Sequence, residues 1–243
     1  MLSFRSIPLD NNHTHLTRHA ERLISLGEMS AGLVHEFKNP ITSLRGFIEL
    51  IRAGVAYEEE YYQVIGDELN RMERLTHELL SFAKPQHQDW ELMTINSICQ
   101  DMAILFRQQL LTHKIHLNVD LTDNLHFLGN RCQIKQVFIN LIKNAIEAIE
   151  EEGSIYITGI HDTRELHVTI KDTGPGIPHI QLSNIMEAFF TTKQSGTGLG
   201  LNMSKKIVED HHGKLIATSK LNEGTMFTLS LPYPDIQTLG QIS

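Results

Sequence analysis

The chain has 243 residues and a mass of 27.6 kDa, which is enough for two ordinary domains. Hydrophobic residues make up 41% and charged residues 21%, which excludes disorder as the overall description of the chain. The net charge of −8 lacks the basic footprint of a general nucleic-acid binder, so we expect no nucleic-acid partner. The sequence offers neither a signal peptide nor an apolar run long enough to cross a bilayer, and we expect this region to be cytoplasmic.

A long helix is predicted from residue 20 to residue 52, because apolar residues recur there at alternating spacings of three and four. Gly54 ends this helix, and after an acidic turn at Glu58 to Glu60 a second helix with the same spacing runs from Tyr62 to Ala83. In the second helix the stripe consists of Tyr62, Ile65, Leu69, Met72, Thr76, Leu79 and Ala83. A hairpin of two such helices cannot cover both apolar stripes by itself. We therefore predict a homodimer in which two hairpins form a four-helix bundle.

A domain boundary is predicted in the polar segment between residues 84 and 91, where a purely helical pattern gives way to a mixed one. Helices are expected near residues 97–113, 132–151 and 199–211, and strands of period two near 115–121, 155–157, 166–170, 215–219 and 225–231. This pattern predicts an α+β fold, with helices on one face of a mostly antiparallel sheet. The expected parts are a flexible lead (1–19), a helical domain (20–84), a second domain (91–235) and a tail (236–243).

The first motif with chemical character is His35-Glu36-Phe37-Lys38-Asn39-Pro40, in the first predicted helix. Heptad counting puts His35 at the outermost position, where its imidazole would face solvent. Glu36 is suited to accept a proton from one ring nitrogen, which leaves the other nitrogen as a nucleophile, and Asn39 lies one turn further on. An ordinary surface histidine explains His35 equally well.

The second motif places Asn140, Lys143, Asn144 and Glu147 on one polar face of a predicted helix. Because Mg²⁺ takes oxygen ligands and keeps several waters, two side-chain amides on this face would suit a hydrated Mg²⁺ held against phosphates. A solvated helix face would show the same pattern.

Two glycine-rich motifs follow. Asp172-Thr-Gly174-Pro-Gly176 comes directly after a strand, where glycines allow close approach and a buried aspartate suits an exocyclic amine such as that of adenine. Gly196-Thr-Gly198-Leu-Gly200 opens a helix, where backbone amides suit a triphosphate. An ordinary turn is the alternative for the first. The second has the wrong spacing for a dinucleotide fingerprint.

In this order the motifs resemble those of the sensor histidine kinases of bacterial two-component systems. The matching segments are an H box at His35, an N box at 140–147, a G1 box at 172–176, an F box at Phe189-Phe190-Thr191-Thr192-Lys193 and a G2 box at 196–200. The resemblance runs from about Leu23 to Pro232 and includes the late pair Gly224-Thr225. It implies a dimerisation and phosphoacceptor hairpin, followed by an α/β-sandwich ATP-binding domain of the kind shared with gyrase and the heat-shock chaperones. Within the family, the chain resembles the sporulation-initiating kinases of spore-forming bacteria.

The resemblance also implies residue roles. The γ-phosphoryl group of ATP would pass to His35, with Glu36 as general base, and then to an aspartate of a response-regulator protein. Asn144, supported by Asn140, would bind Mg²⁺. The remaining nucleotide contacts would come from residues of the boxes, namely Lys143, Glu147, Asp172, Gly174, Gly176, Lys193, Gly196, Gly198, Gly200 and Thr225.

The same resemblance extends to regulation. The pattern His-Glu-x-x-Asn implies a regulator phosphatase activity that uses Asn39. We further expect a membrane-attached parent protein and a small inhibitor protein that binds the hairpin. Two other functions stay open: another ATPase or a serine-directed kinase on the same nucleotide fold, and a dimeric scaffold with a vestigial nucleotide site. The exposed histidine beside a carboxylate argues against the former, and the full set of ligand-type residues against the latter.

Overall fold

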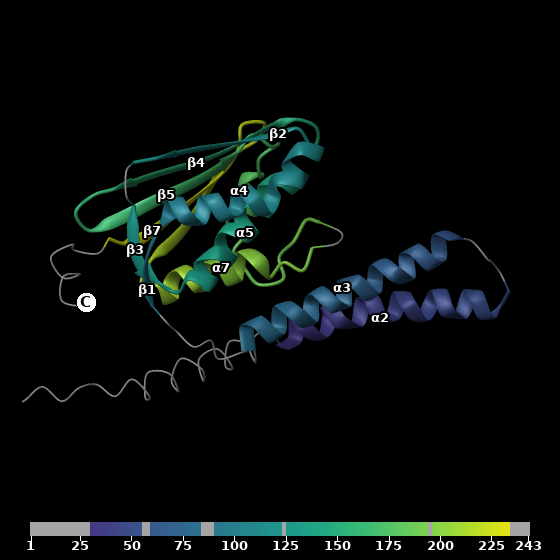
Figure 1. Ribbon diagram of the computed structural model, residues 1–243. Helices are drawn as coiled ribbons and strands as arrows, with labels where there is room; N and C mark the ends of the chain where they lie inside the picture. Colours follow the sequence, from purple (N-terminus) through teal and green to yellow (C-terminus); the bar gives the residue numbers. More distant parts are fainter. Residues whose placement is uncertain (1–29, 55–58, 84–89, 123–124, 194–195, 234–243) are drawn as a thin grey trace, which may run out of the picture. The chain divides into compact units, whose positions relative to one another are not determined.

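The computed structural model describes residues 30–54, 59–83, 90–122, 125–193 and 196–233 (Figure 1). These residues divide into two units: the first contains helices α2 and α3, and the second contains all the strands and the other helices. Within these ranges, no helix has the length and hydropathy needed to cross a bilayer.

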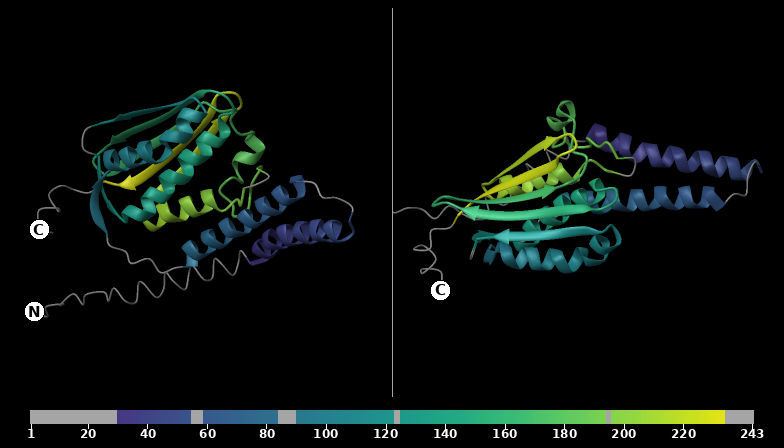
Figure 2. Two further views of the ribbon diagram at one scale, coloured as in Figure 1. Left: turned by 45° about the vertical axis from the view of Figure 1, so that its right-hand side comes forward. Right: turned by 90° about the horizontal axis from the view of Figure 1, so that it is seen from above.

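The first unit is a helical hairpin formed by α2 (Ser30–Arg52) and α3 (Glu59–Ala83), as the heptad spacing predicts (Figures 1 and 2). Pro40 of α2 and Leu75 of α3 are buried, and the rings of Phe47 and Tyr61, one on each helix, lie 5.4 Å apart. α3 begins at Glu59, so the acidic segment predicted as a turn belongs in part to the first turn of the helix. Acidic side chains are favourable there because the helix N-terminus is electropositive.

The predicted apolar stripe of α3 is only partly covered within one hairpin. Its members Ile65 and Met72 are half-buried, whereas Tyr62 and Leu69 are 52% and 53% exposed. A single partner helix covers only a narrow strip of α3, so part of the stripe is left exposed, as expected for a hairpin by itself.

The second unit is built on a five-stranded sheet with strand order β2-β4-β5-β7-β6. Its strands are β2 (Ile115–Leu121), β4 (Gly153–His161), β5 (Glu165–Asp172), β6 (Lys214–Lys220) and β7 (Gly224–Pro232). Only the β2–β4 pair is parallel, so the prediction of a mostly antiparallel sheet is confirmed. At the sheet centre, Val168 pairs with Gly159 on one side and Leu229 on the other.

Helices α4 (Ile95–Thr112), α5 (Arg131–Ala148) and α7 (Gly200–Asp210) cover one face of this sheet (Figure 1). The core lies between the two layers. Its fully buried side chains include Phe138, Leu141 and Ile142 of α5 and Ile155, Leu166 and Leu229 of the strands. The predicted layer of helices on one face is thus confirmed. A short helix, α6 (His179–Leu182), follows β5 and lies outside the prediction.

Two short strands were also absent from the prediction: β1 (Glu91–Thr94) and β3 (His126–Gly129) form a separate antiparallel pair, with Leu92 opposite Leu128. Four residues are too few for a period of two to stand out from chance. This ribbon brings Thr94 and Asn130 to the N-termini of α4 and α5, where their side chains accept hydrogen bonds from Ser97 N and Gln133 N.

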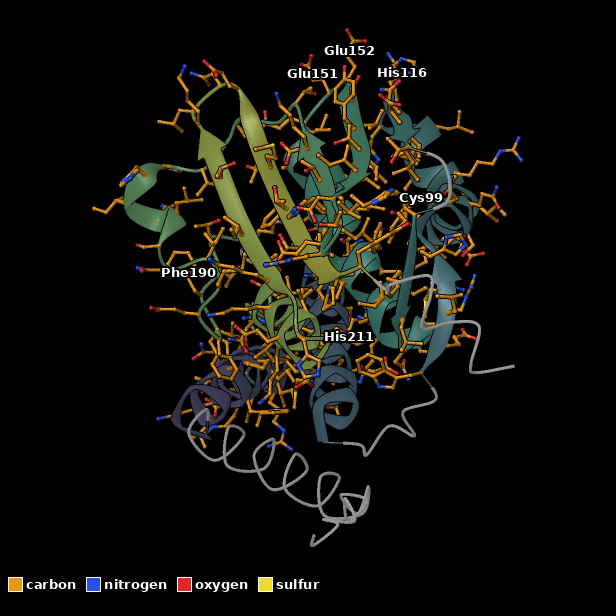
Figure 3. All side chains as sticks on the ribbon, turned by 90° about the vertical axis from the view of Figure 1, so that its left-hand side faces the viewer. Cys99, His116, Glu151, Glu152, Phe190 and His211 are labelled. Carbon is orange, nitrogen blue, oxygen red and sulfur yellow. The ribbon has the colours of Figure 1, made fainter. Side chains whose placement is uncertain are left out.

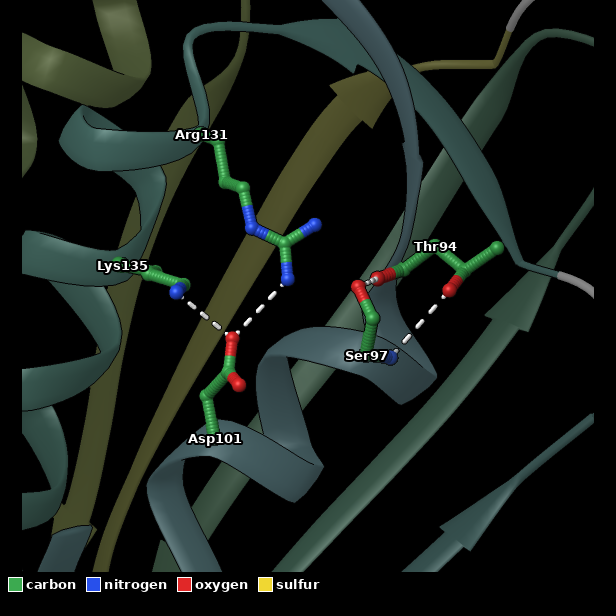
Figure 4. Close-up of polar contacts among 5 residues, drawn as sticks. All are labelled: Thr94, Ser97, Asp101, Arg131 and Lys135. Carbon is green, nitrogen blue, oxygen red and sulfur yellow. Dashed lines mark hydrogen bonds and ion pairs between the residues drawn. The ribbon is translucent and has the colours of Figure 1, made fainter.

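An ion-pair cluster joins α4 to the first turns of α5 (Figure 4). The Asp101 carboxylate contacts Lys135 Nζ at 2.7 Å and Arg131 Nη2 at 3.0 Å. Hydrogen bonds from Lys135 and Arg131 hold the pKa of Asp101 below its ordinary value. The cluster therefore fixes the two helices relative to each other while Asp101 is ionised.

Candidate functional site

Asp172, the last residue of β5, anchors one end of the candidate site. Its Oδ1 accepts hydrogen bonds from Gly174 N at 2.9 Å and from Thr225 N at 3.1 Å, which brings together two predicted site residues 53 positions apart. Burial raises the pKa of this carboxyl, and backbone hydrogen bonds oppose that rise. The bonds from Gly174 and Thr225 both end on Oδ1.

Two glycines near this end of the site allow close backbone approaches. Gly224 has φ +91°, and a Cβ built on it would lie 2.0 Å from the Asp172 carbonyl oxygen. Gly176 has φ +74°, and a Cβ there would lie 2.2 Å from the Lys220 carbonyl oxygen. Both positions therefore require glycine for space and for backbone conformation.

The predicted polar face of α5 lies against the start of α7. Asn140 Nδ2 donates to Ser204 Oγ at 2.9 Å, and Ser204 Oγ donates to the Gly200 carbonyl at 3.0 Å. A Cβ on Gly200 would lie 2.3 Å from Asn140 Oδ1. Asn140 of the N box and Gly200 of the G2 box, 60 residues apart in sequence, are thus packed together.

The other members of this face point away from the core. Lys143 Nζ and Glu147 Oε1 form an ion pair at 3.7 Å, and Asn144 is half-buried between them. At the end of the helix, the Ala148 carbonyl oxygen lies 3.1 Å from the Cβ position of Gly174. α5 therefore contacts the G2 box near its middle and the G1 box at its end.

Phe189 of the F box and Gly198 of the G2 box lie against each other. Phe189 has φ +66°, its N–H donates to the Gly198 carbonyl at 3.0 Å, and a Cβ on Gly198 would meet the Phe189 backbone at 2.4 Å. Gly196 N donates to the Lys193 carbonyl at 3.2 Å, and Lys193 is exposed. Phe190 is partly buried and packs against the core.

In the hairpin, His35 lies on α2, and its side chain is outside the described residues. Asn39 is exposed one turn further on. Glu36 turns toward α3, where its Oε2 accepts from Arg71 Nη2 at 2.9 Å, with side chains only 16% and 18% exposed. Sequence analysis missed Arg71. Arg71 belongs to no motif, and its burial and its Glu36 partner are known only from the fold.

A second missed residue is His211, at the end of α7 (Figure 3). Its buried ring donates from Nδ1 to the Ile207 carbonyl at 2.7 Å and accepts at Nε2 from Asn130 N at 3.0 Å. These partners require the neutral ring with its hydrogen on Nδ1. Trp90 stacks on this ring at 5.0 Å. The ring therefore joins α7 to the start of α5.

Both parts of the chain match known protein families. Residues 25–88 match the His Kinase A (phospho-acceptor) domain, and residues 129–235 match the histidine kinase-, DNA gyrase B-, and HSP90-like ATPase family. A crystal structure of the histidine kinase ThkA in complex with the response regulator protein TrrA is similar to this chain, with 31% identity and a TM-score of 0.76. The match covers 95% of this chain and 68% of that one.

Curated relatives extend the comparison. The chain is 37% identical to sporulation kinase A of Bacillus subtilis (strain 168) over 215 residues, and 34% identical to the signal transduction histidine-protein kinase AtoS of Escherichia coli (strain K12) over 217 residues. Each match covers 88% of this chain but 36% of the relative. The chain therefore spans about a third of the length of these two relatives.

The close approach behind Asp172 yields a stability prediction. We expect Gly224→Ala to lower the free energy of unfolding by about 3 kcal/mol, because the added methyl strains the backbone and collides with the Asp172 carbonyl. Leu221→Ala, in the same turn and 55% exposed, should change it by less than about 0.5 kcal/mol. Urea denaturation followed by circular dichroism measures both, and equal stabilities would contradict the packing described here.

Proposed function

The chain belongs to the sensor histidine kinase family, and we propose that it transfers the γ-phosphoryl group of ATP to His35 and then to an aspartate of a response regulator. The observation that carries this proposal is the convergence on α5 of the N, G1 and G2 boxes, in a chain that also has the hairpin with the H box. A scaffold without nucleotide would not need three glycines, Gly174, Gly200 and Gly224, packed so closely around the polar residues of this site.

The adenine end of the nucleotide is assigned to Asp172. Its Oδ2 is suited to accept from the exocyclic amine, while Gly174 and Thr225 hold the other carboxylate oxygen. The triphosphate is assigned to the segment from Lys193 to Gly200, where α7 begins and its first amides are not used within the helix. Lys143 on α5, which is ion-paired with Glu147, is proposed to add a positive charge near the phosphates.

Mg²⁺ would be held by the amide oxygens of Asn144 and Asn140. The donor set suits this ion: the Asn140 nitrogen already donates to Ser204, so its oxygen faces the start of α7 as a neutral acceptor. When bound, Mg²⁺ supplies positive charge that neutralises the phosphate oxygens during transfer.

At the phosphoacceptor, a ring nitrogen of His35 attacks the γ-phosphorus, a P–N bond forms, and the P–O bond to ADP breaks. The proton on the other ring nitrogen passes to the Glu36 carboxylate. Arg71 supports this assignment because its guanidinium anchors Oε2 of Glu36 and leaves Oε1 as the acceptor.

The hairpin is proposed to pair with a second copy of itself. Apolar side chains on α2 and α3 remain outside the hairpin interior, with exposures of 39–65%: Val34, Ile41, Ile48, Leu50, Tyr62 and Leu69. Val34, Ile41 and Ile48 are spaced by seven, as are Tyr62 and Leu69, so each set forms one line along its helix. Two hairpins joined through these lines would form a four-helix bundle.

Several finer roles are proposed from the resemblance and the relatives. Sporulation kinase A suggests a role in initiating sporulation, and the ThkA–TrrA complex suggests a receiver protein as partner. Attachment of a longer parent to a membrane and a small inhibitor protein bound to the hairpin are proposals of the same kind.

We expect His35→Gln to abolish labelling of the chain by γ-labelled ATP and Mg²⁺, because glutamine has no nucleophilic ring nitrogen. The label on the unaltered chain should be lost in acid and survive in alkali, as for phosphohistidine. His116→Gln, an exposed histidine on β2, is the control and should keep the label. An acid-stable label, or a label that persists in His35→Gln, would contradict the proposal.

Asn39→Ala should separate two activities. Asn39 is exposed one turn from His35, where an amide can orient water toward a phosphorylated regulator. Autophosphorylation should be unchanged, and regulator dephosphorylation should fall roughly a hundredfold. Both rates are measured on the same preparation, and equal losses would refute the phosphatase role.

Ile41→Glu should dissociate the dimer, because it places a carboxylate in the apolar line of α2. Thr42→Glu adds the same charge to the neighbouring exposed position and should leave the dimer intact. Sedimentation equilibrium should give about 55 kDa (2 × 27.6 kDa) for the unaltered chain and Thr42→Glu, and 27.6 kDa for Ile41→Glu. A monomer in all three would rule out the proposed pairing.

A further inference from the structure

Ser219, near the end of β6, lies behind the adenine end of the proposed site and has no role in the motifs. Its hydroxyl oxygen accepts from Ile177 N at 2.7 Å, donates to the Gly224 carbonyl at 2.9 Å and lies 3.1 Å from Thr225 Oγ1. One side chain therefore connects the loop after β5 to the β6–β7 turn.

The hydrogens of this group can be assigned from its partners. A serine hydroxyl has one hydrogen and two acceptor positions. The Gly224 carbonyl can only accept, so the Ser219 hydrogen is directed to it, and the Ile177 N–H takes one acceptor position. In the remaining contact, the Thr225 hydroxyl must donate to Ser219.

This assignment fixes what Thr225 offers to a ligand. With its hydrogen directed at Ser219, the Thr225 oxygen presents only lone pairs elsewhere, and the backbone N–H of the same residue donates to the Asp172 carboxylate, itself an acceptor. Two acceptors at this end of the site suit a base with an exocyclic amine. A base with an oxo group at the same position would bring a third acceptor against them, and the unpaired groups would disfavour binding.

The loop is also held at a second point. Asn222 N donates to the Pro175 carbonyl at 2.8 Å, and Ser219 itself pairs with Thr225 in the strand register. Removal of the Ser219 hydroxyl should therefore leave the β6–β7 hairpin folded while it frees Ile177 and the Thr225 hydroxyl.

We propose that Ser219 is a positioning residue that sets the preference of the nucleotide site for 6-amino over 6-oxo purines, through the loop at Ile177 and the orientation of the Thr225 hydroxyl. This proposal rests on the nucleotide site of the proposed function. It requires no contact between Ser219 and the base.

The test compares the binding of ATP and of inosine triphosphate, which carries an oxo group in place of the 6-amine. Calorimetry on the full chain with His35→Gln measures both affinities without phosphoryl transfer, so a failure of the kinase reaction leaves this readout intact. Ser219→Ala should weaken ATP binding roughly tenfold, the effect of one or two buried hydrogen bonds, and weaken inosine triphosphate binding much less. The ratio of the two affinities should fall accordingly.

Two further variants make the outcome specific. Ser219→Thr keeps the hydroxyl and should restore the ratio. Ser230→Ala is the matched control, because Ser230 lies on the neighbouring strand and its hydroxyl contacts His167 Nδ1 at 2.9 Å, away from the loop. Its ratio should equal that of the parent. An unchanged ratio in Ser219→Ala, or equal weakening of both nucleotides that threonine does not relieve, would overturn the proposal.

Discussion

The packing of α5 against the sheet is the constraint on which the rest of the site depends. Phe138, Leu141 and Ile142 are fully buried, and each such side chain contributes about 1.5–3 kcal/mol of hydrophobic stabilisation. Because the buried face is fixed, the 3.6-residue period of the helix places four polar residues on the other face: Asn140, Lys143, Asn144 and Glu147. Gly174 and Gly200, from two different loops, then approach a helix whose rotation and depth are already set by the core. The apolar contacts of α5 therefore position the residues of the proposed nucleotide site, although they lie in the core and not in the site.

Periodicity along the sequence predicted the long elements well and the short ones poorly. The alternation of Ile155 and Ile157, and of Leu166, Val168 and Ile170, identified two central strands because each buries every second side chain. β1 and β3 were missed because four residues offer only one or two alternations. Spacing alone did not show which apolar residues of α3 face α2 and which, like Tyr62 and Leu69, stay exposed in a single hairpin, because both kinds look identical in sequence.

For the site, the residue types were predictable and their partners were not. Asp172, Asn140 and the glycines were found from motifs, but the bond from Thr225 N to Asp172 depends on the β5–β7 register, which joins segments more than 50 residues apart. Arg71 and His211 belong to no motif. Their significance lies in single partners, Glu36 and Asn130, that only the fold brings within reach. Local patterns therefore identify residues that can bind a ligand. The residues that hold them in position can be identified only from the tertiary structure.

The stacking of Trp90 on His211 has a practical consequence. Trp90 is the sole tryptophan of the chain, so its fluorescence comes from one known place, where the nucleotide-binding unit begins. The ring it stacks on is hydrogen-bonded to the first residue before α5 and to the last turn of α7. Both helices also carry site residues, so a shift of either one on nucleotide binding would change the surroundings of the indole. The protein thus contains an intrinsic optical probe for the state of its own nucleotide site, with no label to attach and no background from a second tryptophan.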